Sequence, residues 1–315
     1  MLEVEMIRNN HLVDPHLHIW GWEIPVYLFL GGLTAGIMIL SSLLARYDPS
    51  SRSSWARYAI FMAPMILSVG MLVLFLDLAH KLHVFRFYTT FELSSPMSWG
   101  SWILLAIYPA TLGMGLAVLT QQEADRLKSF KLIRKVGLTH LINWSRSLVI
   151  KHQSKLIWAN VVLGVGLGVY TGILLSNLGT RAAWNSSLLG PLFLVSGFST
   201  GAAFMLLLPL NSNEQHRLRN WDLLAIGIEI IIIGLYFIGL SSSGSQIKSQ
   251  AANLFLGGKY TALFWSLVVI VGLVVPFLLE WVEKQKNIKP TILAPVLLLI
   301  GGLSLRWILV LAGQT

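Results

Sequence analysis

The stretch LFLGGLTAG, residues 28–36, lies inside an apolar run that starts near Ile24 and reaches Ala45 without a charged residue. A helix of about 20 apolar residues is long enough to cross the hydrocarbon core of a bilayer. A membrane β-barrel needs instead segments of about ten residues with alternating polarity. The run therefore predicts a transmembrane helix.

The rest of the chain repeats this pattern. Of its 315 residues, 55% are hydrophobic and only 12% are charged, whereas soluble proteins carry about a quarter charged residues. We expect an all-α integral membrane protein that forms a single membrane domain over residues 1–315, with eight transmembrane helices. The predicted spans are 24–45, 57–79, 98–119, 156–178, 188–210, 221–240, 260–281 and 291–312.

A faint internal repeat relates the first span to the fifth. LFLVSGFSTG, residues 192–201, resembles LFLGGLTAG, and each stretch contains a G-x-x-x-G motif. Small residues at this spacing allow membrane helices to pack closely. The repeat favours two four-helix halves in parallel orientation, although chance similarity between apolar segments is an open alternative.

The basic residues are distributed unequally between the two sides. Sixteen of the 23 Lys and Arg residues fall on the side that carries loop 120–155, and six fall on the opposite side, which also carries both termini. The positive-inside rule makes the basic side cytoplasmic. We therefore expect a bacterial or archaeal cytoplasmic membrane protein with both termini in the periplasm. The net charge of +9 is confined to these loops, so it does not indicate a nucleic-acid partner.

Loop 120–155 is basic and amphipathic. It is interpreted either as a helical segment that binds the membrane lipids of the anionic inner leaflet or as an ordinary solvated connector. Neither interpretation gives the loop a chemical role.

Polar residues that are costly in a membrane gather towards the periplasmic side. Ionisable residues inside spans are functional candidates by default. The candidates are Trp22, Glu23, Asp77, His80, Trp99, Trp102, Tyr170, Glu229 and Arg306. Two structural alternatives are open: an interfacial belt made by the tryptophans, and a helix-end ion pair of Asp77 with His80 and Lys81.

Several cofactors are disfavoured by the residue inventory. The chain has no cysteine, which excludes thiolate-held iron–sulfur clusters within it. None of the eight histidines lies well inside a predicted span, so we expect no haem, and no metal-ligand spacing is convincing. A lipid-soluble quinone fits acids, histidines and a tyrosine near one membrane face, and a transporter with a polar central site fits them equally.

Five stretches, taken in order, resemble signature segments of the NrfD-like family, the membrane subunits of polysulfide-reductase-type complexes. They are GWEIPVYLFLGGLTAG (21–36), LDLAHKL (76–82), SPMSWGSW (95–102), GVYTGILLS (168–176) and LRWILVLAGQ (305–314). The resemblance implies an eight-helix, haem-free anchor that exchanges electrons between quinone and a partner with iron–sulfur clusters. That partner would be a ferredoxin-like subunit on the periplasmic face, connected to a molybdopterin or multihaem cytochrome subunit.

The resemblance also implies residue roles. Tyr170 would hydrogen-bond a quinone oxygen, and Asp77 and His80 would exchange protons, although many family members have Arg-Pro where this chain has His80 and Lys81. The segment with His18, Trp22 and Glu23 would form another wall of the site.

The SPMSWGSW segment would complete the pocket. We expect Trp99 and Trp102 to wall it, Ser98 to cap the third span, and Gly100 to permit a close approach between helices or to a ligand. Glu229 and Arg306, with Asp77, are candidates for a proton pathway.

The leading hypothesis is thus a non-haem, quinone-reactive membrane subunit of a respiratory oxidoreductase, which is not catalytic alone and for which proton translocation is left open. Menaquinone is preferred over ubiquinone. The alternatives are an ion or solute transporter and a purely structural membrane anchor.

Overall fold

The computed structural model describes residues 20–47, 54–78, 80–92, 95–129, 139–177, 181–242, 246–286, 288 and 291–315. Within these ranges every regular element is helical, and eight helices are long and apolar enough to cross a membrane. This confirms the predicted fold class. The spans are α1 Glu23–Tyr47, α2 Ser54–Asp77, α4 Pro96–Val118, α8 Gln153–Ser176, α9 Leu189–Leu206, α10 Ser212–Ser241, a composite helix Thr261–Gln285, and α14 Leu293–Ala312.

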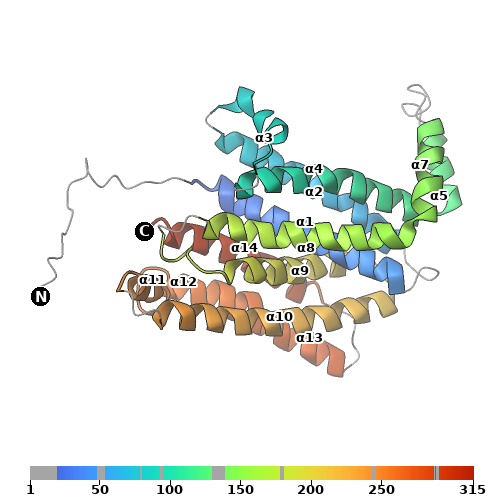
Figure 1. Cartoon of the computed structure of the whole chain (residues 1–315). Helices are drawn as coiled ribbons and strands as arrows, with labels where there is room; N and C mark the ends of the chain where they lie inside the picture. Colours follow the sequence, from blue (N-terminus) through green and yellow to red (C-terminus); the bar gives the residue numbers. More distant parts are fainter. Residues whose placement is uncertain are drawn as a thin grey trace, which may run out of the picture.

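Shorter helices lie at the two ends of the bundle (Figure 1). The composite span consists of α12 Thr261–Leu263, a π-helical segment Phe264–Val274 and α13 Val275–Gln285. The short helices are a 3₁₀ turn Lys81–His83, α3 Arg86–Thr89, α5 Gln121–Ser129, α7 Thr139–Lys151 and α11 Gln246–Leu256.

Three spans differ from the predicted bounds by four residues or more at one end. The helix predicted to end at 281 continues to Gln285. The helix predicted from 221 begins at Ser212, because Asn211 and Glu214 form a capping box in which the Asn211 N–H donates to the Glu214 carboxylate at 2.9 Å. The helix predicted to reach 210 ends at Leu206. Pro209 follows, and a proline disfavours helical geometry in the residue before it.

The two most buried spans, α1 and α9, cross through the repeated glycines. A methyl group added at Gly197 would lie 2.7 Å from the carbonyl oxygen of Gly32, and one at Gly201 would lie 2.6 Å from the Cα of Gly36. Real Cβ atoms do not approach other heavy atoms so closely, so the crossing requires glycine on both helices. Helix α1 also packs against α2, α8 and α14 and is therefore the central helix of the bundle.

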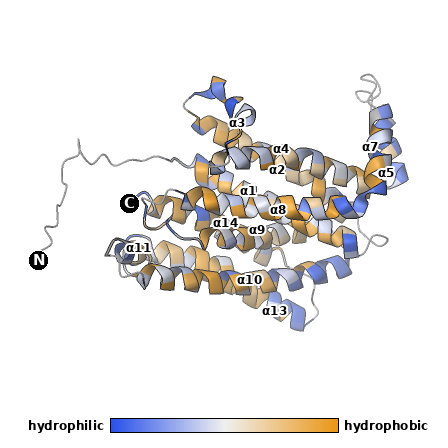
Figure 2. Cartoon of the chain, viewed as in Figure 1, coloured by the Kyte–Doolittle hydropathy of each residue, from blue (hydrophilic) through white to orange (hydrophobic). Residues whose placement is uncertain are grey.

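The start of α1 and the C-terminus meet at one end of the bundle, on the same side as α3 and α11 (Figure 1). The Trp20 N–H donates to the Gln314 side-chain oxygen at 2.9 Å, and the Gln314 side-chain amide donates to the Trp20 carbonyl at 3.1 Å. Trp184 stacks on Trp20 and donates its indole N–H to the Leu309 carbonyl at 2.8 Å. Figure 2 shows hydrophilic residues concentrated at both ends of the bundle, with hydrophobic residues between them.

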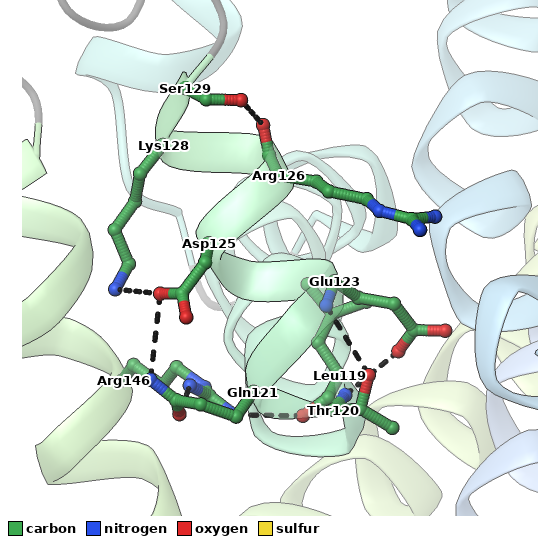
Figure 3. A network of polar contacts seen from close by, with 9 residues as sticks. All are labelled: Leu119, Thr120, Gln121, Glu123, Asp125, Arg126, Lys128, Ser129 and Arg146. Carbon is green, nitrogen blue, oxygen red and sulfur yellow. Dashed lines mark hydrogen bonds and ion pairs between the residues drawn. The ribbon is translucent and has the colours of Figure 1, made fainter.

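Helices α5 and α7 form a polar lobe at the opposite end (Figure 1), inside the predicted loop 120–155. Thr120 and Glu123 cap α5 reciprocally, as Figure 3 shows. Glu123 also accepts hydrogen bonds from Arg57 at 2.9 Å and Tyr58 at 2.8 Å, which joins α5 to the start of α2. Arg146 of α7 donates to the Leu119 carbonyl at 2.9 Å.

The exposed face of α7 carries two large apolar side chains. Trp144 is 63% exposed and Leu148 is 48% exposed. The basic stretch between α5 and α7, residues 130–138, lies outside the described residues.

We predict that Gly36→Ala destabilises the folded chain by about 1–3 kcal/mol, because the new methyl group would overlap the Gly197 carbonyl. Thermal unfolding in detergent measures the effect. The matched control is Gly234→Ala, where no atom lies within 4 Å and an alanine favours helix. Equal melting temperatures for wild type and Gly36→Ala would contradict the tight crossing.

A second prediction concerns Glu123. Although partial burial acts to raise the pKa of Glu123, the hydrogen bonds from Arg57, Thr120 and Tyr58 outweigh it and lower that pKa to about 2. The carboxylate is thus bound more favourably in the folded state than in the unfolded state, where its pKa is about 4.3. Its contribution to stability is complete above that value and is lost as the pH falls towards 2.

We therefore expect Glu123→Gln to lower stability by about 1–2 kcal/mol at neutral pH, with a difference from wild type that shrinks between about pH 4.3 and 2. Asp125→Asn is the control, because the Asp125 carboxylate is exposed and its ion pair with Lys128 contributes little. A pH-independent difference would refute the charged role of Glu123.

Candidate functional site

A cavity of about 280 Å³ opens among α1, α2, α4 and α8, at the end of the bundle that carries Trp20 and α3. Its wall is mainly apolar, and Asp77 and the half-exposed Met97 lie at its surface edge. The polar side chains in the wall are Tyr27, Asp77, Tyr88, Ser95, Ser101, Tyr170 and Asn177. An apolar pocket with a few polar groups is typical of a small-molecule site.

Tyr170 is held in the wall by its contact with α4. The side chain is only 5% exposed, and a methyl group at Gly100 would overlap its ring, so glycine is required there. The predicted close approach at Gly100 is therefore the contact with Tyr170. The hydroxyl of Tyr170 interacts with that of Tyr27, which is also buried and extends from α1. A pair of tyrosine hydroxyls, each able to donate and accept, thus lies at the cavity.

The SPMSWGSW segment reaches the cavity through residues other than its tryptophans. Pro96, Met97 and Ser101 line it. Trp99 is partly buried outside this lining, and Trp102 is 41% exposed with its ring edge-on to Phe91 at 5.8 Å between centroids. Neither tryptophan belongs to the described lining of the cavity, and a role for them in quinone binding stays a prediction.

The capping assignment in this segment is also corrected. The N-cap of α4 is Ser95, and Pro96 is the first helical residue. Ser98 lies one turn further on, where its hydroxyl accepts from the Glu92 N–H at 2.9 Å and donates to the Thr90 carbonyl at 3.2 Å. It therefore fixes the preceding outer segment against α4.

Of the other predicted site residues, some lie at the mouth of the cavity and others lie outside its lining. Asp77 lines the cavity, and Glu23 is near enough for the two carboxylates to repel. Trp22 is 50% exposed, and His80 is exposed on the outer segment; neither lines the cavity. Among the described residues, Asp77 makes no ion pair with His80 or Lys81 within 4 Å. His18 lies outside the described residues.

Arg306 of α14 and Glu229 of α10 are buried in the interior of the bundle, beside α1 and α9. Arg306 is fully buried, and its guanidinium donates to the carbonyl oxygens of Leu28, Phe193 and Gly302 and to the Ser196 hydroxyl, at 2.8–3.3 Å. Glu229 interacts with the same Ser196 hydroxyl and with the charge of Arg306. No direct pairing of these two residues is predicted from the sequence, whereas the structure brings them together through Ser196.

Besides Glu214 of the capping box, four more buried ionisable residues lie between Glu229 and the end of the bundle where α10 begins. They are Arg219 and Asp222 on α10 and Glu280 and Glu283 on α13. Sequence reasoning missed them because they lie near the ends of their predicted spans, where charged residues normally reach water. A signal was present: Arg219 and Asp222, and likewise Glu280 and Glu283, are spaced by three residues, which places each pair on one helical face.

No metal site is indicated in the part of the chain that the structure describes, where no group of three or more His, Asp or Glu side chains converges. The cavity fits an aromatic head group with polar oxygens instead, because its wall is apolar and its tyrosine hydroxyls and Asp77 supply hydrogen-bonding groups.

Comparison with known proteins gives consistent matches along the chain. The profile of the family described as "Polysulphide reductase, NrfD" matches residues 10–315. Protein NrfD of Escherichia coli is 31% identical, with 94% of this chain and 95% of that protein aligned. One of the chains of the polysulfide reductase of Wolinella succinogenes is 29% identical, with the same coverage. One of the subunits of the selenate reductase of Mesobacillus selenatarsenatis is 28% identical over 93% of this chain and 73% of that protein.

Proposed function

The chain belongs to the NrfD family, and from this premise we propose that it binds quinone or quinol in the cavity between α1, α2, α4 and α8. As an NrfD-like protein it is a multi-pass membrane subunit of reductase complexes. The observation that carries the proposal is the apolar cavity with Tyr170, Tyr27 and Asp77 in its wall.

The chemistry required of the protein is the handling of protons at two oxygen atoms. A bound quinone or quinol supplies the two-electron redox chemistry. Tyr170 donates a hydrogen bond to an oxygen of the head group, and Tyr27, which is hydrogen-bonded to the Tyr170 hydroxyl, fixes the orientation of that hydroxyl. Asp77, at the exposed edge of the cavity, exchanges protons with the adjoining aqueous phase as a general acid or base. His80 lies on the adjacent outer segment, from which it relays protons to that phase.

We assign the two ends of the bundle to the two sides of the membrane from the distribution of Lys and Arg. The end of the bundle that carries α5 and α7 has the larger share of Lys and Arg, which supports a cytoplasmic location for it. The cavity, Trp20 and the C-terminus then face the periplasm of a cytoplasmic membrane. Menaquinone is our preferred quinone for this site.

The electron partner binds at the same periplasmic face. The outer segment next to the cavity exposes apolar and basic side chains together, with Leu82 88%, Phe85 55% and Phe91 57% exposed beside Lys81 and Arg86. Exposed apolar residues of this density mark an interaction surface. We assign to it a ferredoxin-like iron–sulfur subunit, which connects in turn to a molybdopterin or multihaem cytochrome subunit. The relatives named as parts of polysulfide and selenate reductases support an assembly of this kind.

A proton route is the second part of the proposal. The buried residues Arg306, Ser196 and Glu229 lie in contact inside the second half of the bundle, where ionisable groups are costly and need a function or a partner. We assign them, with Asp77 at the outer end, to proton movement across the membrane that accompanies quinone turnover.

We expect Tyr170→Phe and Asp77→Asn each to lower quinol-dependent turnover of the intact complex by about 10–100-fold, because each removes a proton-handling group. The matched control is Tyr236→Phe, which removes a buried hydroxyl bonded at 2.6 Å to the Ala183 carbonyl, remote from the cavity lining. Unchanged kcat and KM for quinol in both site variants would reject the cavity, and would leave a purely structural anchor as the better description.

We expect Glu229→Gln to retain electron transfer but to lower the charge moved per electron in liposomes by at least half, because the amide cannot carry a proton. Membrane potential and external pH are recorded together during turnover. Asp125→Asn, an exposed carboxylate of α5, is the control. Coupling equal to wild type in Glu229→Gln would exclude the route while leaving the quinone site intact.

A further inference from the structure

Asp222 of α10 and Glu280 of α13 form a buried carboxyl pair in the second half of the bundle, towards its proposed cytoplasmic end. Asp222 is 0% and Glu280 is 1% exposed, and the two carboxyl groups lie within hydrogen-bonding reach of each other. The Ser199 hydroxyl of α9 donates to Asp222 Oδ1 at 2.6 Å. In the described part of the chain, no donor is bonded to Asp222 Oδ2 or to either oxygen of Glu280. The three oxygens without a donor are therefore those of the pair itself.

The charges around the pair do not compensate it. Arg306 on α14 faces Glu229 on α10. Arg219 on α10 is ion-paired with Glu283 on α13 at 3.5 Å and also attracts Glu280, so this one cation cannot neutralise Asp222, Glu280 and Glu283 together. Asp222 and Glu280 are then left as two carboxylates in contact, in an interior where one uncompensated charge is already expensive. Two carboxyl groups at this separation do not both ionise.

We infer that Asp222 and Glu280 hold a single proton between them, with Glu280 as the protonated donor and Asp222 as the charged acceptor. Asp222 takes the charge because it already accepts from Ser199, whereas Glu280 has no other donor among the described residues. The ligand of this site is a proton. Its place in proton translocation rests on the proposed function.

The pair lies between the Glu229 site and the loops at the proposed cytoplasmic end. Glu229 lies seven positions after Asp222 on α10, which corresponds to about 10 Å along the helix axis. Ser199 and Ser196 of α9 stand beside them, one bonded to Asp222 and the other in contact with Glu229.

The opposite side of the pair is closed by a second set of polar bonds. Arg219 donates to the Ile288 carbonyl at 3.1 Å, and Glu283 accepts from the Thr291 N–H at 2.9 Å. The Arg219–Glu283 pair therefore separates the shared proton from the connection between α13 and α14.

The test is infrared spectroscopy of the full chain in membranes, in H₂O and D₂O at neutral pH. We expect a carbonyl band of a protonated carboxylic acid that shifts in D₂O, disappears in Glu280→Gln and changes position in Asp222→Asn. Asp125→Asn, a substitution of an exposed carboxylate of α5, leaves the band in place. If a single variant does not fold, the neutral double variant Asp222→Asn/Glu280→Gln replaces it, and it too lacks the band.

Three outcomes would overturn the proposal. The first is the absence of such a band in the wild-type chain, and the second is its persistence in Glu280→Gln or in the double variant. The third is a carboxylate band that responds to replacing choline by sodium, because that response would show a bound cation in place of the proton. The spectrum needs no turnover, so it is independent of the quinone site. Charge translocation by Glu280→Gln in liposomes then tests the role: a lost band with unchanged coupling removes the pair from the route.

Discussion

The buried guanidinium of Arg306 is the interaction on which the arrangement of the bundle depends. It bonds to main-chain carbonyls of α1, α9 and α14 at the place where α1 and α9 cross. A methyl group at Gly32 would lie 2.6 Å from one of its nitrogens, so the same glycine that admits α9 also leaves space for the arginine. A charge in this position is tolerable only because its N–H groups meet oxygens and Glu229 supplies the opposite charge. The helices are thus fixed by polar bonds where apolar packing alone has little preference in lipid.

The two polar regions lie among different helices of the bundle. Tyr27, Tyr170 and Asp77 line a cavity among α1, α2, α4 and α8, whereas Glu229, Asp222 and Glu280 are enclosed on α10 and α13. Helix α1 contributes to both, because Tyr27 lines the cavity and the Leu28 carbonyl binds Arg306. Neighbouring residues of one rigid helix therefore connect the proposed quinone site with the proposed proton route.

Much of the fold was predictable because lipid imposes strong rules on sequence. Eight apolar runs specify eight helices, and the repeated glycines indicated the close crossing. Tyr170 and Asp77 were predicted as site residues, and both line the cavity. The faces of the α4 tryptophans were not predictable, because three-residue spacing places Trp99 and Trp102 together without saying which neighbour they meet. Asp222 and Glu280 were missed because their contact joins two helices and depends on helix rotation, which apolar runs do not encode.

The mutual hydrogen bonds of Trp20 and Gln314 hold the C-terminal residues beside the start of α1. A domain attached after Thr315 would emerge beside the first turn of α1, on the face where the cavity opens. Tethering at that point would hold such a domain at high local concentration above the proposed quinone site and require no extra membrane crossing. The position of the C-terminus therefore makes this chain suited to gene fusion with a water-soluble electron carrier.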